Sequence, residues 1–262
     1  MADTNRVEEN IAVIMLTFNQ RDLTLQALAS LLAIQNPPFY TIVWDNGSQD
    51  GTAEAVHEAF PQVLVHHHPS NLGVASGRNA SADLAIKRWN PTHLLFLDND
   101  MLVEPDFVAA LLRPFTEGGE VGQTQAKLRL MHQPDRLNDG GGVQINFLLG
   151  KTRHVGYGEI DHGQYDSTKR CTACGGATMV RSDLFQQLGG FDPTFDPFGP
   201  EDIDFSLRLQ KAGYQAQFVP RAVAYHMVSH TFGKGYTEDY ARHKSRHWFV
   251  FMRRHASPFQ QL

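Results

Sequence analysis

Cysteine is scarce in this 262-residue chain, which contains only Cys171 and Cys174. A tetrahedral zinc site needs four ligands, and no second cysteine pair is present to complete one. The C-x-x-C spacing also occurs in redox proteins, but no thioredoxin-like pattern of elements surrounds it here. We therefore expect both cysteines to be free thiols that are buried as small core residues.

Long apolar runs are absent as well. No stretch reaches the roughly 18 residues that a membrane-spanning helix needs. Residues 1–10 form a polar, acidic N-terminal tail without the apolar centre of a signal peptide. A net charge of −5 is not that of a nucleic-acid-binding protein. We expect a cytoplasmic protein with no nucleic-acid partner.

Two common nucleotide-binding loops are also missing, since neither G-x-G-x-x-G nor a Walker lysine loop follows the first expected strand. This excludes ordinary dinucleotide and P-loop sites. What is present is an alternation of apolar strands with helical patterns, which predicts an α/β fold with a doubly wound, mostly parallel sheet. The strands are expected at 11–16, 39–44, 63–65 and 93–97, and the helices at 22–35, at 53–60 and from just after Gly73 to about residue 89.

The character of the sequence changes near residue 118, after a helical pattern over 104–115. Residues 118–170 are rich in glycine and show neither a helical nor an alternating period, so we expect a loop-rich region there. Regular elements resume with a strand at 177–180, helices at 182–188 and 200–213, and a strand at 222–225. We divide the chain into the tail, a first half at 11–117, a second half at 118–235 and a C-terminal helix within 236–262.

An acidic triplet, Asp98-Asn99-Asp100, follows the apolar run of the strand at 93–97. Asp98 and Asp100 point the same way in extended backbone, because successive side chains alternate. Two carboxylates on one side repel each other unless a cation joins them, and hard oxygen ligands suit Mg²⁺ or Mn²⁺. The alternative is an ordinary acidic turn, for which Asp and Asn are common.

Polar clusters follow two other expected strands in the same way. They are Thr17 with Asn19, and Asp45 with Asn46. Ligands of open α/β sheets bind beyond the carboxyl ends of the strands, so a nucleotide lying along this edge would meet all three clusters. By contrast, we interpret the run at 66–68, three successive histidines, as a solvated strand end, because alternation sends them to two faces.

Taken together, six short motifs resemble the inverting glycosyltransferases of family 2, and in particular their rhamnosyltransferase-like branch. The resemblance covers about residues 10–255 and implies the nucleotide-diphospho-sugar-binding GT-A fold. The motifs are AVIMLTFN (12–19), DNGSQDGT (45–52), NLGVASGRN (71–79), DND (98–100), GGFD (189–192) and EDID (201–204).

The resemblance implies a role for each matching residue. Donor-binding residues would be Thr17, Asn19, Asp45, Asn46, Asn71, Gly73, Arg78, Asp98 and Asn99, with Asp45 accepting the N3–H of uracil or thymine. The metal, Mn²⁺ or Mg²⁺, would be bound by Asp100 and His226, and the acceptor by Gly175, Gly176 and Glu201. Asp202 would be the catalytic base.

Several of these roles have alternatives. Asp45 also fits a turn cap, and Arg78 a surface charge on a helix. His226 competes with His230, and either histidine fits a structural role equally well.

The implied reaction moves a sugar from dTDP-rhamnose or a UDP-sugar to a hydroxyl of a glycan or lipid-linked glycan. A nucleotidyltransferase is an alternative, but it needs a basic glycine-rich loop after the first strand, which this sequence lacks. The second alternative is a non-catalytic domain that binds a nucleotide-sugar.

The C-terminal segment is basic. From Arg221 to Leu262 the charge is +5, so residues 1–220 carry −10. Aromatic and basic residues alternate over 236–255, which fits either packing on the body or peripheral contact with the inner face of a membrane. We favour packing, and leave the oligomeric state open.

Overall fold

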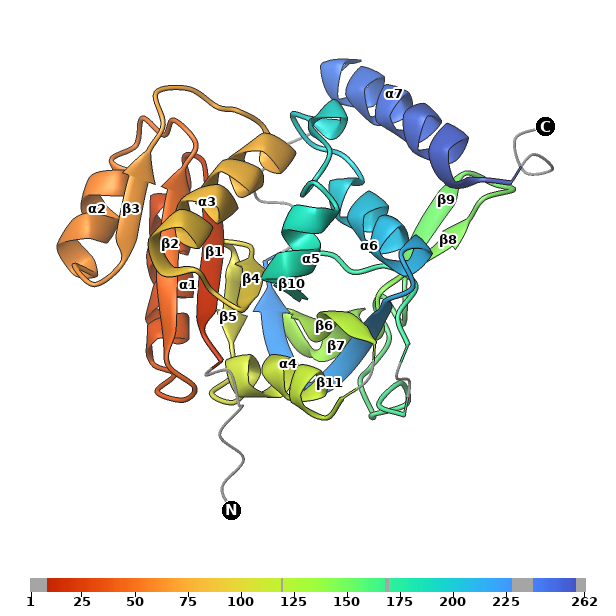
Figure 1. Cartoon of the computed structure of the whole chain (residues 1–262), viewed down its shortest axis with the longest axis horizontal. Coiled ribbons are helices and arrows are strands. Elements are labelled where there is room, and N and C mark those ends of the chain that lie inside the picture. Colours follow the sequence, from red (N-terminus) through yellow and green to blue (C-terminus); the bar gives the residue numbers. More distant parts are fainter. Residues whose placement is uncertain (1–8, 119, 168–169, 228–237, 258–262) are drawn as a thin grey trace.

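A computed structural model of the chain describes residues 9–118, 120–167, 170–227 and 238–257 (Figure 1). The elements, in chain order, are β1 (Ile11–Thr17), α1 (Arg21–Leu32), β2 (Phe39–Asp45), α2 (Thr52–Ala59), β3 (Leu64–His67), α3 (Val74–Trp89), β4 (His93–Leu97), β5 (Met101–Val103), α4 (Phe107–Thr116), β6 (Val121–Leu130), β7 (Gln133–Asp139), β8 (Val143–Asn146), β9 (Lys151–His154), β10 (Ala177–Arg181), α5 (Ser182–Gln187), a 3₁₀ turn η1 (Pro193–Phe195), α6 (Glu201–Lys211), β11 (Gln215–His226) and α7 (Glu238–His255).

One mixed sheet runs through the described molecule in the order β3-β2-β1-β4-β10-β6-β11-β5, with β7 added beside β6. Strands β3, β2, β1 and β4 are parallel, which confirms the α/β fold and the alternation expected for the first half. Strand β10 then enters antiparallel between β4 and β6. The two halves of the chain therefore share a single sheet.

Helices cover both faces of this sheet (Figure 1). Along β1, Ile11, Val13 and Met15 pack with α1 and α4, whereas Ala12 and Ile14 pack with α3, α5 and α6. The strict alternation of side chains along the strand produces these two cores. Because both faces are buried, the strand is apolar at every position but the last.

The expectation of a loop-rich stretch over 118–170 is wrong, since β6, β7, β8 and β9 lie there. The first eight residues of β6 are buried although half of them are polar. Hydrogen bonds engage several of these side chains: Gln123 Nε2 donates to Thr178, and Thr124 donates to the carbonyl of Leu111. The Oε1 atom of Gln123 has no hydrogen-bond partner among the described residues. Because polar residues occupy buried positions, β6 lacks the regular spacing of apolar residues from which a strand is predicted, and the sequence analysis did not predict it.

Cys171 and Cys174 are free thiols and both are buried, as expected. Among the helices that the structure describes, none is long and apolar enough to cross a membrane.

Helix α7 is joined to α6 by a buried charge cluster around Asp204, whose side chain is fully buried. Its carboxylate accepts hydrogen bonds from Arg208 at 2.7 Å, Arg254 at 2.7 Å and His255 at 2.8 Å. Burial alone would raise the pKa of Asp204, but the bonds from His255, Arg254 and Arg208 lower it to about 2. Packing of the C-terminal helix on the body is thus confirmed for the described residues.

We expect Asp204→Asn to lower the free energy of unfolding by about 2 kcal/mol at neutral pH, because an ionised acid with a depressed pKa stabilises the folded state. The effect should be present above the ordinary pKa of 3.8 and shrink as the pH falls through about 2. Chemical denaturation across this range measures it. Asp183→Asn, which breaks the exposed pair with Arg181, is the control and should cost less than about 1 kcal/mol. An equal loss in both variants would contradict the role of Asp204.

Candidate active site

The carboxyl ends of β1, β2 and β4 meet at one edge of the sheet, beside a cleft of ≈ 560 Å³. Eight of the residues that the sequence assigned to the site line this cleft: Thr17, Asn46, Asn71, Arg78, Asp98, Asn99, Asp100 and His226. They come from the ends of β1, β2, β4 and β11, from the loop between β3 and α3, and from α3 itself, so the topology of the sheet assembles most of them. The aromatic ring of Phe198, which follows η1, forms part of the opposite wall.

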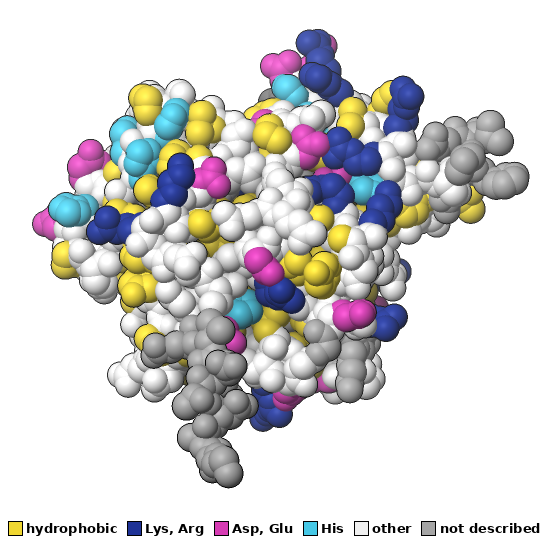
Figure 2. Space-filling model, viewed as in Figure 1, with side chains coloured by type: hydrophobic (Ala, Val, Ile, Leu, Met, Phe, Trp, Pro, Cys, Tyr) yellow, Lys and Arg dark blue, Asp and Glu magenta, His cyan; other side chains and the backbone are white. Residues whose placement is uncertain are grey.

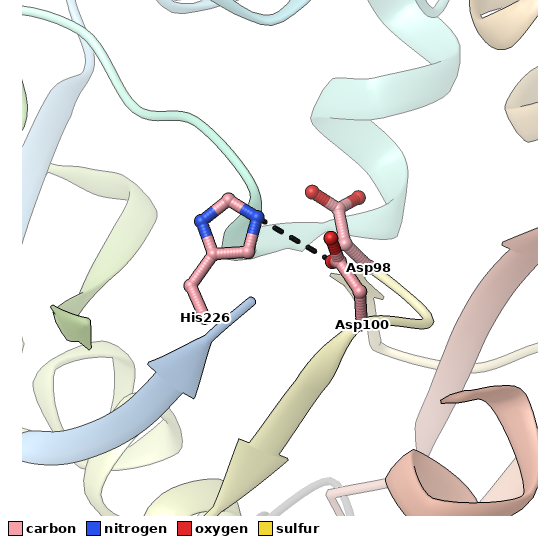
Figure 3. A group of neighbouring side chains, drawn as sticks. All are labelled: Asp98, Asp100 and His226. Atoms are coloured by element: carbon pink, nitrogen blue, oxygen red, sulfur yellow. Dashed lines mark ion pairs between the residues drawn. The ribbon is translucent and has the colours of Figure 1, made fainter. Parts of the chain in front are cut away.

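Asp98, Asp100 and His226 form a cluster with ligand atoms within 4.8 Å of one another (Figure 3). Strand β11 pairs with β5 so that His226 lies opposite Met101, directly beyond the acidic triplet. The Nε2 atom of His226 is 3.4 Å from Asp100 Oδ1, and its Nδ1 is 2.9 Å from Asn138 Oδ1. An Nδ1–H donated to Asn138 leaves the Nε2 lone pair facing the carboxylates.

This donor set fits a divalent cation. Two carboxylates and one imidazole are ligands that suit Mn²⁺ and also serve Mg²⁺. Burial would lower the pKa of His226, but the carboxylate of Asp100 outweighs it and raises that pKa. The competing His230 lies outside the described residues. His226 faces the two carboxylates, and its binding of a metal remains a prediction.

Arg78 is not a surface charge, so that alternative is wrong. Its side chain is 11% exposed and bridges two acids, with Nη2 2.5 Å from Asp98 Oδ1 and Nη1 3.1 Å from Glu201 Oε1. Burial lowers the pKa of Arg78, but Asp98 and Glu201 raise it further, so the guanidinium stays charged. One cation from α3 therefore connects the end of β4 to the start of α6. Contact with the donor diphosphate remains a prediction.

The two acids at the start of α6 differ in their protonation. Burial and the neighbouring Asp202 raise the pKa of Glu201 to about 8, against the opposing effect of Arg78. Burial raises the pKa of Asp202 only to about 6, since Arg78 and the backbone N–H of Ile203 favour its charged form. At neutral pH Glu201 holds its proton and Asp202 is ionised. Asp202 is then the acid able to accept a proton.

Gly175 and Gly176 lie between the two groups of carboxylates. A Cβ on Gly175 would be 2.9 Å from Asp202 Oδ2, and one on Gly176 would be 3.4 Å from Asp98 Oδ2. Gly176 also has φ +60°, a region that side chains rarely adopt. Only backbone fits in this position, so it separates the metal cluster from Asp202. Acceptor binding by these glycines remains a prediction.

Asp45 has the turn-capping role that the sequence offered as its alternative. Its carboxylate is almost fully buried and accepts from Ser48 N at 2.9 Å, while its other oxygen pairs with His67 Nδ1 at 2.8 Å. The interpretation of residues 66–68 as a solvated strand end agrees with the structure, since they lie at the end of β3 and none of them is buried. Alternation separates them: His66 and His68 stack on Trp44, whereas His67 pairs with Asp45.

Thr17 and Asn99 position the first loop of the cleft. Asn99 Nδ2 donates to Thr17 at 3.2 Å, to Thr24 at 2.9 Å and to Gln20 at 2.9 Å. The side chain of Asn19 is exposed and accepts from the backbone of Gln49.

Asn46 and Asn71 organise the second loop. The Nδ2 of Asn46 donates to Asn71 at 2.8 Å and to the carbonyl of Gly73 at 3.1 Å. These amides hold the backbone at the floor of the cleft, and their contact with a donor remains a prediction.

The sequence analysis missed Asp196, which caps α3 from far along the chain. Its carboxylate accepts from the backbone of Ala75 at 2.9 Å and of Ser76 at 3.2 Å. Gly73 precedes α3 with φ +92°, and a Cβ there would collide with Asp196. One signal was available: the helix begins Gly-Val-Ala-Ser, with no capping side chain of its own.

His154 and Asp139 form a second pair that no sequence signal indicated. Asp139 is fully buried, accepts from the backbone of Gly141 and Gly142, and lies 2.8 Å from His154 Nδ1. Burial would lower the pKa of His154, but the bond to Asp139 raises it, and the charge of Asp202 adds to this. When protonated, this imidazole on β9 favours the ionised form of Asp202.

Comparison with known proteins identifies the family. The model described as "Glycosyltransferase like family 2" matches residues 9–250. This chain belongs to glycosyltransferase family 2. This match confirms the activity class that the motifs implied. We therefore set aside the nucleotidyltransferase and the non-catalytic alternatives.

Two curated relatives of this family 2 glycosyltransferase act in glycan synthesis. It is 25% identical to the N-acetylglucosaminyl-diphospho-decaprenol L-rhamnosyltransferase of Mycobacterium tuberculosis, over 94% of this chain and 85% of that protein. It is 22% identical to the poly-beta-1,6-N-acetyl-D-glucosamine synthase of Staphylococcus epidermidis, over 86% of this chain and 52% of the relative.

Solved structures confirm the GT-A fold of this family 2 glycosyltransferase. GalNAc-T7, crystallised with UDP, GalNAc and Mn²⁺, matches with a TM-score of 0.71 at 18% identity, over 92% of this chain and 48% of that one. The mannosyltransferase PcManGT from Pyrobaculum calidifontis, in complex with GDP-Man and Mn²⁺, matches with a TM-score of 0.63 at 18% identity, over 95% of this chain and 66% of that one. The chain thus spans about half the length of the first structure and two thirds of the second.

We expect Arg78→Gln to lower the free energy of unfolding of this family 2 glycosyltransferase by about 3–5 kcal/mol, because it leaves two buried acids without their cation. Adding Glu201→Gln should restore part of the loss, since it removes one of them. Thermal or denaturant unfolding of the single and double variants measures the coupling. Arg88→Gln, on the exposed face of the same helix, should cost less than about 0.5 kcal/mol. If the losses of unfolding free energy in Arg78→Gln and Glu201→Gln simply add in the double variant, Arg78 does not pair with Glu201.

Proposed function

We propose that the chain is an inverting, metal-dependent glycosyltransferase that moves a sugar from a nucleoside diphosphate to a hydroxyl of a glycan or lipid-linked glycan. One observation carries this proposal: the cluster of Asp98, Asp100 and His226, which could hold a metal, lies close to Asp202. A Cβ on Gly175 would contact Asp202, and one on the next residue, Gly176, would contact Asp98. With the nucleoside diphosphate held at the cluster and a base near the acceptor, the acceptor hydroxyl can displace the diphosphate directly.

The cation, Mn²⁺ or Mg²⁺, would be held by Asp100 and His226 with Asp98 beside it, and it would neutralise charge on the departing diphosphate. Arg78 hydrogen-bonds to both Asp98 and Glu201 and so holds the two sides of the site together. Asp202 takes the proton of the acceptor hydroxyl as that oxygen attacks the sugar. A single ionised acid on the acceptor side supports one displacement, and hence inversion.

The printed names of relatives support the substrate classes. The mycobacterial relative is a rhamnosyltransferase acting on an N-acetylglucosaminyl-diphospho-lipid. Its similarity favours dTDP-rhamnose or a UDP-sugar as donor here, and a lipid-linked glycan as acceptor. A pyrimidine contact by Asp45 would use a carboxylate that Ser48 and His67 already engage. Peripheral membrane contact through 236–255 also remains a proposal, of which residues 236–237 lie outside the described part.

We expect a nucleoside diphosphate, UDP or dTDP, to bind only with Mn²⁺ or Mg²⁺, and Asp100→Ala to weaken that binding by at least about tenfold, as loss of a charged ligand pair does. Titration calorimetry with the metal and with EDTA measures this. Asp106→Ala removes an exposed acid away from the cleft and should leave the affinity unchanged. Equal affinity with EDTA and with Mn²⁺ would refute metal dependence.

We expect Asp202→Asn to cut turnover by about 10²–10⁴-fold while donor affinity stays the same, because a positioned base contributes that much. Turnover of the parent enzyme should rise with pH through about 6, as Asp202 loses its proton. Release of nucleoside diphosphate across pH measures both. Glu201→Gln, which mimics the protonated acid, should keep most of the activity. If Glu201→Gln is inactive and Asp202→Asn is not, the two roles are reversed.

A further inference from the structure

A second, narrower cleft of ≈ 270 Å³ lies between the start of α6 and helix α7. Phe198 lines both this cleft and the larger one that holds the metal cluster. Asp202 lines only the narrower cleft. The two clefts therefore share a wall, with the leaving-group side on one face of it and the proposed base on the other.

Packing fixes the walls of this narrower cleft before any ligand binds. Tyr240 stacks on Phe198, with ring centroids 4.9 Å apart and planes inclined by 17°. The buried His247 lies with its Nδ1 2.8 Å from the carbonyl oxygen of Phe198. Trp248 packs at 5.0 Å against the fully buried Phe251. A preformed site loses little entropy on binding.

The lining has a specific chemistry. Phe198, Tyr240 and Trp248 offer aromatic surface, which suits the C–H face of a sugar ring, and Asp202 is the acid among them. The Nζ of Lys244 lies 5.5 Å from the centroid of the Tyr240 ring, so a cation borders the aromatic surface. Figure 2 shows Lys and Arg side chains gathered in the region where Figure 1 places α7. An anionic group attached to the sugar would complement this charge.

We propose that this narrower cleft is the acceptor subsite, and that it takes a sugar whose anomeric oxygen carries phosphate. The ring lies on Tyr240 and Trp248, the phosphate meets Lys244, and the attacking hydroxyl faces Asp202. The proposal rests on the proposed function for the role of Asp202 alone. Phe198 then sets the distance between donor and acceptor.

Binding of two soluble probes tests this assignment. N-acetylglucosamine 1-phosphate carries the anionic group, and methyl N-acetylglucosaminide has the same ring without it. We expect Trp248→Ala to weaken both probes by about tenfold, as truncation of an aromatic anchor does. Lys244→Ala should weaken only the phosphate probe, by about tenfold, the worth of a charged hydrogen bond. Titration or saturation-transfer NMR, with and without UDP and Mn²⁺, measures these affinities.

Matched controls come from the same helix. Arg246→Ala removes an equally exposed cation, and Phe249→Ala removes a 64% exposed ring; neither residue lines the cleft. Both should bind the probes as the parent does, and every variant should keep its affinity for UDP. Lys244 is exposed, so its replacement tests the site even if Trp248→Ala perturbs packing.

The outcomes separate this proposal from the proposed function. The subsite is wrong, and the transferase proposal stands, if UDP binds normally but neither probe binds. The same holds if Lys244→Ala leaves the affinity for the phosphate probe unchanged. An equal loss in Arg246→Ala would reduce the effect to general attraction by a basic helix and overturn the subsite. If probes bind as expected but UDP does not, the donor side of the proposed function fails and the subsite is supported.

Discussion

The guanidinium of Arg78 is shared by carboxylates from two distant parts of the chain, Asp98 at the end of β4 and Glu201 at the start of α6. Both acids are largely withdrawn from water, where like charges repel strongly and an unpaired ion is costly. The cation favours the ionised forms of both Glu201 and Asp202, against burial, which raises their pKa values to about 8 and about 6. The position of α6, the charge of the proposed base and the shape of the donor cleft all depend on this one side chain.

Helix α7 is held against α6 by a second group of buried charges. The cluster around Asp204 fixes its C-terminal turn to α6, and His247 and Phe251 fix its middle. A basic, aromatic helix thus forms one wall of a cleft instead of lying free. Its exposed side keeps Phe249 and several cations, so the proposed membrane contact would use a different face of the helix from the one that packs on the body.

The sequence predicted those parts of the site that local pattern determines. Strand β4 and the acids after it stand out because an apolar run ends in charge, and parallel strand ends converge at one edge. It could not predict β6, because some of its buried polar side chains bond to other elements, as Gln123 does to Thr178 and Thr124 to Leu111. The sequence analysis also failed to predict the capping of α3 by Asp196 and the pair of Asp139 with His154, because each joins different elements of the structure.

Strand β10 lies between β4 and β6, although some 80 residues of chain separate it from β4. During synthesis the ribosome delivers β4 long before the segment that covers its open side. Until residues 177–181 emerge, a strand of apolar residues presents unpaired backbone to any neighbouring chain. Slow translation or heat at that moment favours aggregation over folding. The nascent N-terminal half therefore carries an aggregation-prone sheet edge, which β10 covers in the finished fold.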